Sequence, residues 1–297
     1  MFFRRSGDPD PITRQNTEGT NMKVQILGSA AAECFPALWC ECEYCAKARK
    51  NGEIRRRAAY RVDDDTLIDF GPDIHWQTTE FGIDLTKIRR VILTHPHGDH
   101  LSPIEFLWRK HWFSKAKHEI DLYGAPSVFS KILAFCAGDS HLLSMENDLK
   151  MRTHAMGHGS TEQADDLTIF AMDADHAPGM QPLLYLLTRG GKTVFIGNDT
   201  GWFPPQTWDA LAGKKIDLAI LDCTNGLNFP DEGRGHMGAN VVIRVKKKLE
   251  EMGCLKDGAR VVATHFSHNG GGSQAEFEAF FDPHGIETGF DGKIMEI

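Results

Sequence analysis

Apolar residues along the chain gather in short runs, and each run ends at glycine, proline or polar residues. Short runs bounded by turn residues are typical of buried β-strands. We therefore expect strands over residues 23–28, 66–70, 90–94, 167–172, 183–188, 193–196, 218–221 and 260–264. The Arg189-Gly190-Gly191-Lys192 segment between two of these runs predicts a hairpin.

Three segments have helical signals. Residues 127–136 follow a proline-led start, and residues 241–252 carry apolar side chains on one face and stop at Gly253. Residues 273–281 begin at a serine cap and end before Pro283. Strand-like and helix-like segments thus alternate, without a repeat of fixed period. This pattern predicts an α/β fold, with a mixed sheet at the core and helices outside.

Length and composition fit one globular domain. The chain has 297 residues, of which 41% are hydrophobic and 25% charged, values typical of a folded domain. We expect residues 1–21 to be a flexible, polar lead-in and residues 22–297 to form the domain, with Met22 as an alternative start. There is no apolar run long enough for a transmembrane helix, so we expect no membrane partner.

Charge and cysteine content limit the expected partners and cellular location. The formal net charge of −8 argues against nucleic-acid binding, which depends on the neutralisation of phosphates by lysine and arginine. The seven cysteines are an odd and unevenly spaced set, unlike the disulfide framework of a secreted protein. We therefore expect a cytoplasmic protein, and a homodimer is left open.

One polar segment carries the most specific signal for chemistry. The strand over 90–94 runs directly into Thr94-His95-Pro96-His97-Gly98-Asp99-His100. Imidazole and carboxylate groups suit Zn²⁺, Mn²⁺ or Fe²⁺. If the loop curls at Gly98, His95 and His97 can meet one ion while Asp99 and His100 reach a second. A solvated polar loop would explain a single histidine, but this density of ligands favours a two-metal site.

Further ligands follow other predicted strands, in the segments Asp-Ala-Asp-His176, Asn198-Asp199-Thr-Gly and Thr-His265-Phe-Ser-His268. Each has an ordinary reading as a turn residue. Their shared position after strands favours a common site, because polar side chains at strand ends gather at one edge of a sheet.

This series of motifs resembles the metallo-β-lactamase superfamily over about residues 22–297. The resemblance implies a four-layer αβ/βα sandwich with two divalent ions at one edge, which share a hydroxide of lowered pKa. It implies that His95, His97 and His176 hold one ion, that Asp99, His100 and His265 hold the other, and that Asp199 bridges them. Asn198 replaces the usual glycine, and Asp69 resembles a carboxylate that supports the histidine loop.

A cluster of cysteines requires a separate explanation. Cys40, Cys42 and Cys45 give the spacing C-x-C-x2-C, and structural zinc normally takes four such ligands. We expect His268 to complete a Cys3His zinc site. Free surface thiols and a redox cluster are the alternatives.

The cysteine segment and the His265–His268 pair resemble the PhnP-type phosphodiesterases of carbon–phosphorus lyase operons, and PqqB-type proteins are similar. This resemblance implies a small cyclic or nucleotide-like phosphodiester as substrate. His236, in a Gly-His-Met-Gly segment, resembles an extra catalytic histidine, so we expect His236 and Asp99 to be catalytic. His158 is a weaker candidate, the run Arg55-Arg56-Arg57 could contact phosphate or be solvated, and His111 and His118 are read as structural.

The sequence therefore predicts a dinuclear metal-dependent phosphodiesterase with one additional structural zinc. A carbonyl-ester hydrolase, either lactonase or thioesterase, could use the same two ions. A non-catalytic carrier of the PqqB type is the alternative outside enzymes. A transfer-RNA-processing nuclease is less favoured, because there is no long basic insert.

Overall fold

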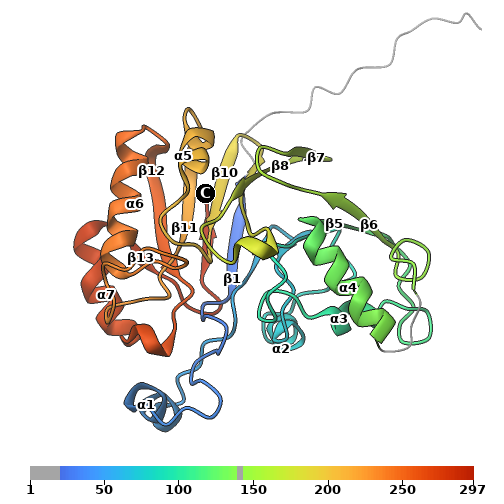
Figure 1. Ribbon diagram of the computed structural model, residues 1–297, viewed down its shortest axis with the longest axis horizontal. Helices are drawn as coiled ribbons and strands as arrows, with labels where there is room; N and C mark the ends of the chain where they lie inside the picture. Colours follow the sequence, from blue (N-terminus) through green and yellow to red (C-terminus); the bar gives the residue numbers. More distant parts are fainter. Residues whose placement is uncertain (1–20, 139–142) are drawn as a thin grey trace, which may run out of the picture.

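The computed structural model describes residues 21–138 and 143–297, and two seven-stranded β-sheets face each other at its centre (Figure 1). The first sheet contains, in spatial order, β14 (Ile294–Glu296), β1 (Lys23–Gly28), β2 (Ala59–Val62), β3 (Thr66–Ile68), β4 (Arg90–Ile92), β5 (Ile120–Gly124) and β6 (Met151–Ala155). The second contains β13 (Glu287–Thr288), β12 (Leu255–Thr264), β11 (Ile216–Asp222), β10 (Lys192–Gly197), β9 (Leu183–Arg189), β8 (Leu167–Asp173) and β7 (Thr161–Ala164).

Each sheet is antiparallel on one side and parallel on the other. In the first sheet, β14 to β3 pair antiparallel and β3 to β6 pair parallel. In the second, β7 to β10 pair antiparallel and β10 to β13 pair parallel. The carboxyl ends of neighbouring parallel strands meet at one edge, so each sheet presents several loop starts there.

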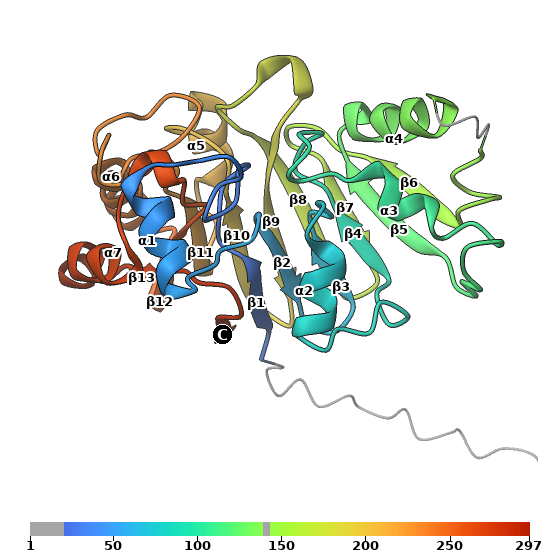
Figure 2. The ribbon, with the colours of Figure 1, turned by 90° about the horizontal axis from the view of Figure 1, so that it is seen from below.

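Helices cover the outer faces of both sheets (Figures 1 and 2). The first sheet is covered by α2 (Ile74–Glu80), α3 (Pro103–Leu107) and α4 (Pro126–Gly138). The second is covered by α5 (Pro205–Leu211), α6 (Ala239–Glu251) and α7 (Gln274–Phe281), with short 3-10 turns at Pro178–Met180, His268–Gly270 and Asp282–His284. Helix α1 (Glu43–Asn51) projects from the body at the lower edge of Figure 1.

Alternating side chains divide the core into layers. On β10, Val194 and Ile196 face the first sheet, whereas Phe195 packs under the outer helices. The same alternation on β1 sends Ile26 between the sheets and Leu27 outward. The expected four-layer αβ/βα sandwich is therefore confirmed.

The hydrophobic pattern locates the strands that flank the site but not the edges of the sheets. All eight predicted strands and three predicted helices are present, and Ser273 caps α7 in a reciprocal capping box with Glu276. The pattern misses the interior strands β2 and β5, the edge strands β6, β7, β13 and β14, and the helices α1, α2, α3 and α5. The expected lead-in lies almost wholly outside the described residues. Among those residues, no helix combines the length and apolar character needed to cross a bilayer.

Candidate metal centre

The polar residues predicted to form one site follow the carboxyl ends of strands in both sheets. The histidine loop follows β4, whereas His176, Asp199 and His265 follow β8, β10 and β12. On the second sheet the register pairs Gly197 with Leu221 and Leu221 with Ala263. Asp199 and His265, which follow these strands, therefore lie close together at one edge of the sheet.

The first ligand set joins His95, His97, His176 and Asp199, whose ligand atoms all lie within 4.8 Å of one another. The Nδ1 atom of His97 lies 2.8 Å from Nε2 of His95 and 3.0 Å from Nε2 of His176. Three ring nitrogens this close cannot all satisfy one another by hydrogen bonds. A divalent cation coordinated by all of them would explain their convergence.

The second set joins Asp99, His100, Asp199 and His265 within the same limit. The Nε2 atom of His100 lies 3.0 Å from carboxylate oxygens of both Asp99 and Asp199 but forms no hydrogen bond. The Nε2 of His265 and Oδ1 of Asp199 are also buried without a hydrogen-bond partner. Such orphaned atoms are costly unless a ligand satisfies them. Oxygen and nitrogen donors in this arrangement fit two divalent ions that share Asp199.

Backbone strain and electrostatics suit metal binding. Asp69, Asp199 and His265 all have positive φ angles, between 55° and 63°, a conformation that non-glycine residues adopt rarely and often at functional sites. Burial and the neighbouring His100 lower the pKa of His95 to about 4. His95 is therefore neutral at pH 7, the form in which histidine binds metals. Burial opposes ionisation of Asp199, but the nearby histidines hold its pKa well below the usual range.

Asp69 orients the histidine loop from below, as the sequence suggests. Its carboxylate accepts hydrogen bonds from the backbone N–H of Thr94 at 2.8 Å and from the Thr94 hydroxyl at 2.9 Å. It also lies 2.6 Å from Nδ1 of His100. The Thr94 hydroxyl lies 3.0 Å from Nδ1 of His95. These contacts occupy Nδ1 of both rings and leave Nε2 to face the site.

In the second sheet, Asp222 and Thr224 orient the ring of His265 in the same way. Neither residue was predicted from the sequence. The Thr224 hydroxyl lies 2.8 Å from the carboxylate of Asp222 and 2.7 Å from Nδ1 of His265. Asp222 also accepts a hydrogen bond from the backbone N–H of Met237. A signal was available, since Leu-Asp-Cys-Thr follows a buried strand as Asp199 does.

Asp222 also holds His236 at the open side of the centre. The Nδ1 of His236 lies 3.2 Å from the carboxylates of both Asp222 and Asp199. Burial disfavours the charged ring, but these carboxylates outweigh it and raise the pKa of His236 to about 9. The ring of His236 keeps 28% of its side chain exposed, whereas that of His100 is fully buried. A substrate can therefore reach His236 directly.

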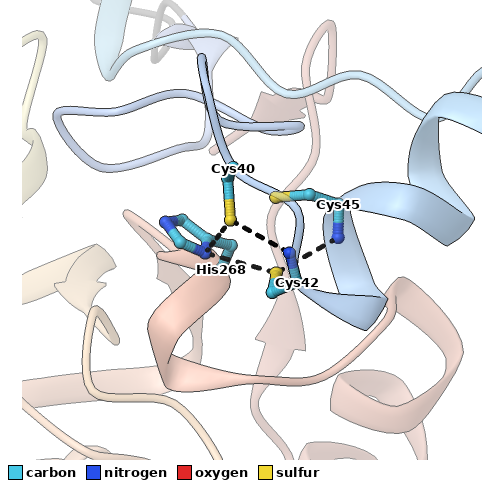
Figure 3. Close-up of side chains that lie close together, drawn as sticks. All are labelled: Cys40, Cys42, Cys45 and His268. Carbon is cyan, nitrogen blue, oxygen red and sulfur yellow. Dashed lines mark hydrogen bonds between the residues drawn. The ribbon is translucent and has the colours of Figure 1, made fainter.

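The predicted cysteine cluster is brought together with His268 (Figure 3). Nδ1 of His268 lies 3.5 Å from Sγ of Cys40 and 3.6 Å from Sγ of Cys42, and its Nε2 lies 3.5 Å from the Glu33 carboxylate. Burial opposes the thiolate of Cys42, but backbone and side-chain hydrogen bonds lower the pKa of this thiol to about 6. Burial raises the pKa of Cys45 to about 12. Three sulfurs and one oriented imidazole fit a tetrahedral zinc ion.

Other candidate residues lie in different surroundings. His158 accepts a hydrogen bond from the backbone N–H of Asp173 and belongs to none of the ligand clusters in the described residues. The expected solvated run at residues 55–57 is wrong for Arg55, which is buried and donates to Gly289 O and Gln274. Arg56 and Arg57 pair with Asp291 and Asp73, so these arginines serve the fold.

Asn198 is the departure from the family pattern noted in the sequence. Its side chain is 1% exposed, and both polar atoms lack a hydrogen-bond partner. The neighbouring Asp199 keeps its place in both ligand sets. The asparagine therefore does not displace the Asp199 carboxylate from the two ligand sets.

Comparison with known proteins agrees with this geometry. A family model described as "Beta-lactamase superfamily domain" matches residues 65–266. Coenzyme PQQ synthesis protein B of Azoarcus sp. (strain BH72) is 24% identical over 316 residues, covering 93% of this chain and 100% of that protein. Ribonuclease Z of Methanothermobacter thermautotrophicus is 26% identical over 156 residues, but the match covers only 52% of this chain and 45% of the ribonuclease.

A similar solved structure is that of a new diphosphatase from the PhnP family. It superposes with a TM-score of 0.68 at 19% identity and covers 94% of this chain and 98% of its own. At this identity the similarity establishes the fold. The geometry of the two ligand sets is then the basis for arguing chemistry.

Proposed function

Since the chain belongs to the metallo-β-lactamase superfamily, we propose that it is a metal-dependent phosphodiesterase acting on small cyclic or nucleotide-like phosphodiesters. The observation that carries the proposal is the pairing of His236 with Asp222 beside two convergent ligand sets. When a phosphodiester is hydrolysed, one ester oxygen departs as an alkoxide, which needs a proton. His236 is the exposed acid beside the site.

We propose two active-site ions, zinc or manganese with iron as a further candidate, and one structural zinc. The first ion would be held by His95, His97 and His176, and the second by Asp99, His100 and His265, with Asp199 shared. When bound, such ions lower the pKa of water and neutralise the charge of the ester oxygens. The structural zinc would be held by Cys40, Cys42, Cys45 and His268.

The protein's own groups would supply proton transfer. Asp222 engages Nδ1 of His236, which leaves Nε2 to carry a proton to the departing oxygen. Asp99 is 8% exposed, and its carboxylate can orient the attacking water and accept its proton. Thus Asp99 would act on the attacking water and His236 on the departing oxygen.

The decisive test is hydrolysis by purified, metal-loaded protein. We expect turnover of bis(p-nitrophenyl) phosphate and of 2′,3′-cyclic nucleotides, measured by nitrophenolate absorbance and by chromatography. Inorganic diphosphate, an aryl acetate and a lactone complete the panel, because they separate phosphodiester cleavage from anhydride and carbonyl chemistry. A folded protein that contains the ions and cleaves none of the phosphodiesters would refute the proposal.

Replacement of His236 tests its role. We expect His236→Gln to lower the rate on cyclic nucleotides by about 10²–10⁴-fold, with little change in metal content. His158→Gln is the matched control, because His158 lies outside the ligand clusters of the described chain, and it should keep full activity.

A second candidate function is a binding or carrier role of the PqqB type. The observation in its favour is the alignment with coenzyme PQQ synthesis protein B over that protein's whole length. Metal analysis discriminates the two readings: three ions per chain support the enzyme, whereas a single ion that is lost in Cys40→Ser supports the carrier. The seven cysteines, an odd and unevenly spaced set, support a cytoplasmic location for either role.

A further inference from the structure

A separate cavity of about 690 Å³ opens on the outer face of the first sheet. It lies between α2, α3 and the segment 108–120, on the side of the sheet away from its partner sheet. Both helices are short, at seven and five residues, so they leave part of the sheet's outer face uncovered. A cavity of this size is within the range of small-molecule sites.

The floor of the cavity is apolar. It is formed by buried side chains that belong to the outer core of this sheet: Phe70, Ile74, Ile88, Val91, Phe106 and Ile120. At the rim, Leu85 and Trp108 are each 39% exposed. An apolar chain or ring placed here would remove both from water, which is favourable.

The mouth of the cavity is positively charged. Arg109 is half-buried there and donates to three backbone carbonyls, those of His118, Leu149 and Lys150. In residues 21–138 and 143–297 Arg109 forms no ion pair, so the groups that its guanidinium contacts are neutral carbonyls. A half-buried cation without a carboxylate favours an anionic ligand.

Other polar groups at the mouth agree with this charge. Lys115 and Lys117 line the same opening and are exposed, whereas Glu105 is the acidic residue of the lining. The hydroxyl of Ser114 is buried and has no hydrogen-bond partner. Together they provide a hydrogen-bond donor and positive charge above an apolar floor.

We propose that this cavity binds an amphipathic carboxylate, an apolar chain or ring headed by a single anion. The apolar part would lie on the Phe70–Phe106 floor, and the carboxylate would lie between Arg109, Lys115 and the Ser114 hydroxyl. The site is distinct from the metal centre but adjoins it: the Phe70 N–H donates to the carbonyl of His100, and Phe70 follows Asp69 directly. The proposal does not depend on the phosphodiesterase activity.

Binding of octanoate to the full chain, measured by calorimetry, tests the proposal. We expect one saturable site per chain and at least tenfold weaker binding of 1-octanol, which has the same chain without the charge. In Ala116→Trp, a large side chain replaces a small lining residue, and we expect octanoate binding to be lost. The Lys150 contact at Ala116 uses the backbone carbonyl, so this substitution leaves it in place.

A surface double variant keeps the test independent of folding. Lys115→Glu with Lys117→Glu should weaken octanoate binding about tenfold at low salt and leave 1-octanol unaffected. The matched control, Lys47→Glu with Lys50→Glu on α1, makes the same charge change away from the cavity and should bind octanoate normally. The proposal is overturned by the absence of saturable octanoate binding to folded protein, or by equal binding of octanoate in both double variants.

Discussion

The two sheets support the candidate metal centre with the same device, an aspartate paired with a threonine. Asp69 and Thr94 stand at the ends of β3 and β4, and Asp222 and Thr224 stand at the end of β11. In each pair the carboxylate accepts the threonine hydroxyl, and Nδ1 of a predicted ligand histidine is engaged. Both sheets thus orient imidazole rings with the same pair of residue types.

The Asp69–Thr94 and Asp222–Thr224 pairs differ in the further side chains that their carboxylates contact. Within the described residues the Asp69 carboxylate forms hydrogen bonds with Thr94 and His100 alone, whereas Asp222 also contacts the more exposed His236. The first sheet therefore builds a closed ligand scaffold. The second adds the more exposed His236, so we expect that mutation can separate ligand support from proton transfer.

The largest expected effect follows from Asp222→Asn. We expect turnover of 2′,3′-cyclic nucleotides to fall about 10²–10⁴-fold, because His236 loses the carboxylate that favours its protonated form. Bis(p-nitrophenyl) phosphate should lose much less, since nitrophenolate departs without a proton. Steady-state rates on the two substrates give the comparison.

Metal content is the control for this variant. It should fall less than in Asp69→Asn, because Thr224 still engages Nδ1 of His265 and Asp222 lies 3.3 Å from that atom, whereas Asp69 lies 2.6 Å from Nδ1 of His100. Equal losses on both substrates, together with lost metal, would show that Asp222 acts only as Asp69 does and would remove the distinction between the sheets.

Asp69→Asn should have the next largest effect. Supporting carboxylates of this kind contribute about 10–100-fold in metal affinity or activity. We expect affinity to fall by that amount in chelator competition, with equal loss on both substrates and recovery in excess metal. Asp121→Asn is the matched control, since Asp121 in the same sheet contacts Arg152 and His154 and should bind metal normally. Loss that depends on the leaving group would contradict the assignment.

The smallest effect concerns an ion-pair network between the two sheets. Asp65 follows β2 and pairs with Arg90 at 2.6 Å and with Arg189 of the facing sheet at 3.0 Å. Burial opposes ionisation, but Arg189, Thr66 and Arg90 outweigh it and lower the pKa of Asp65. A depressed folded pKa stabilises the protein above the unfolded pKa of about 3.9, and this stabilisation is lost as pH falls through the folded value.

We therefore expect Asp65→Asn to lower the free energy of unfolding by about 1 kcal/mol at pH 7. The difference from wild type should shrink below about pH 4. Urea unfolding at pH 7, 5 and 3 measures it. A difference that grows on acidification would mean that Asp65 is not the anion of this network.

Site residues could be predicted from the sequence where several ligands lie within one short segment. They could not be predicted where a role depends on a partner far along the chain. His95 to His100 are dense enough to identify, and the following strands supply His176, Asp199 and His265 in order. Asp222 was missed because one aspartate at a strand end has no meaning until His236, fourteen positions later, folds back onto it. The Arg55 guanidinium was misread because burial against Gly289, far along the chain, is invisible in a short charge run.

The same reasoning explains the fold. Central strands such as β10 and β11 contain continuous buried apolar runs, at residues 194–196 and 218–221, and these runs are predicted from composition alone. Edge strands such as β7 (TEQA) pair on one side and face water, so their polar residues look like loop. Helix α1 has a polar sequence stabilised at its start by the sulfur of Cys42, which accepts from the Cys45 N–H, and hydrophobic periodicity does not detect such a cap.

The cysteine cluster with His268 also has a consequence for biosynthesis. His268 follows Cys40 by 228 residues, so the sulfurs leave the ribosome long before their imidazole partner exists. His265, the last residue of the second ligand set, emerges equally late. An ion that requires every donor can bind only after translation has passed His268 and the second sheet has formed. Metal occupancy would then indicate that translation has passed His268, and a chain that ends before this residue would lack the imidazole partner of the sulfurs.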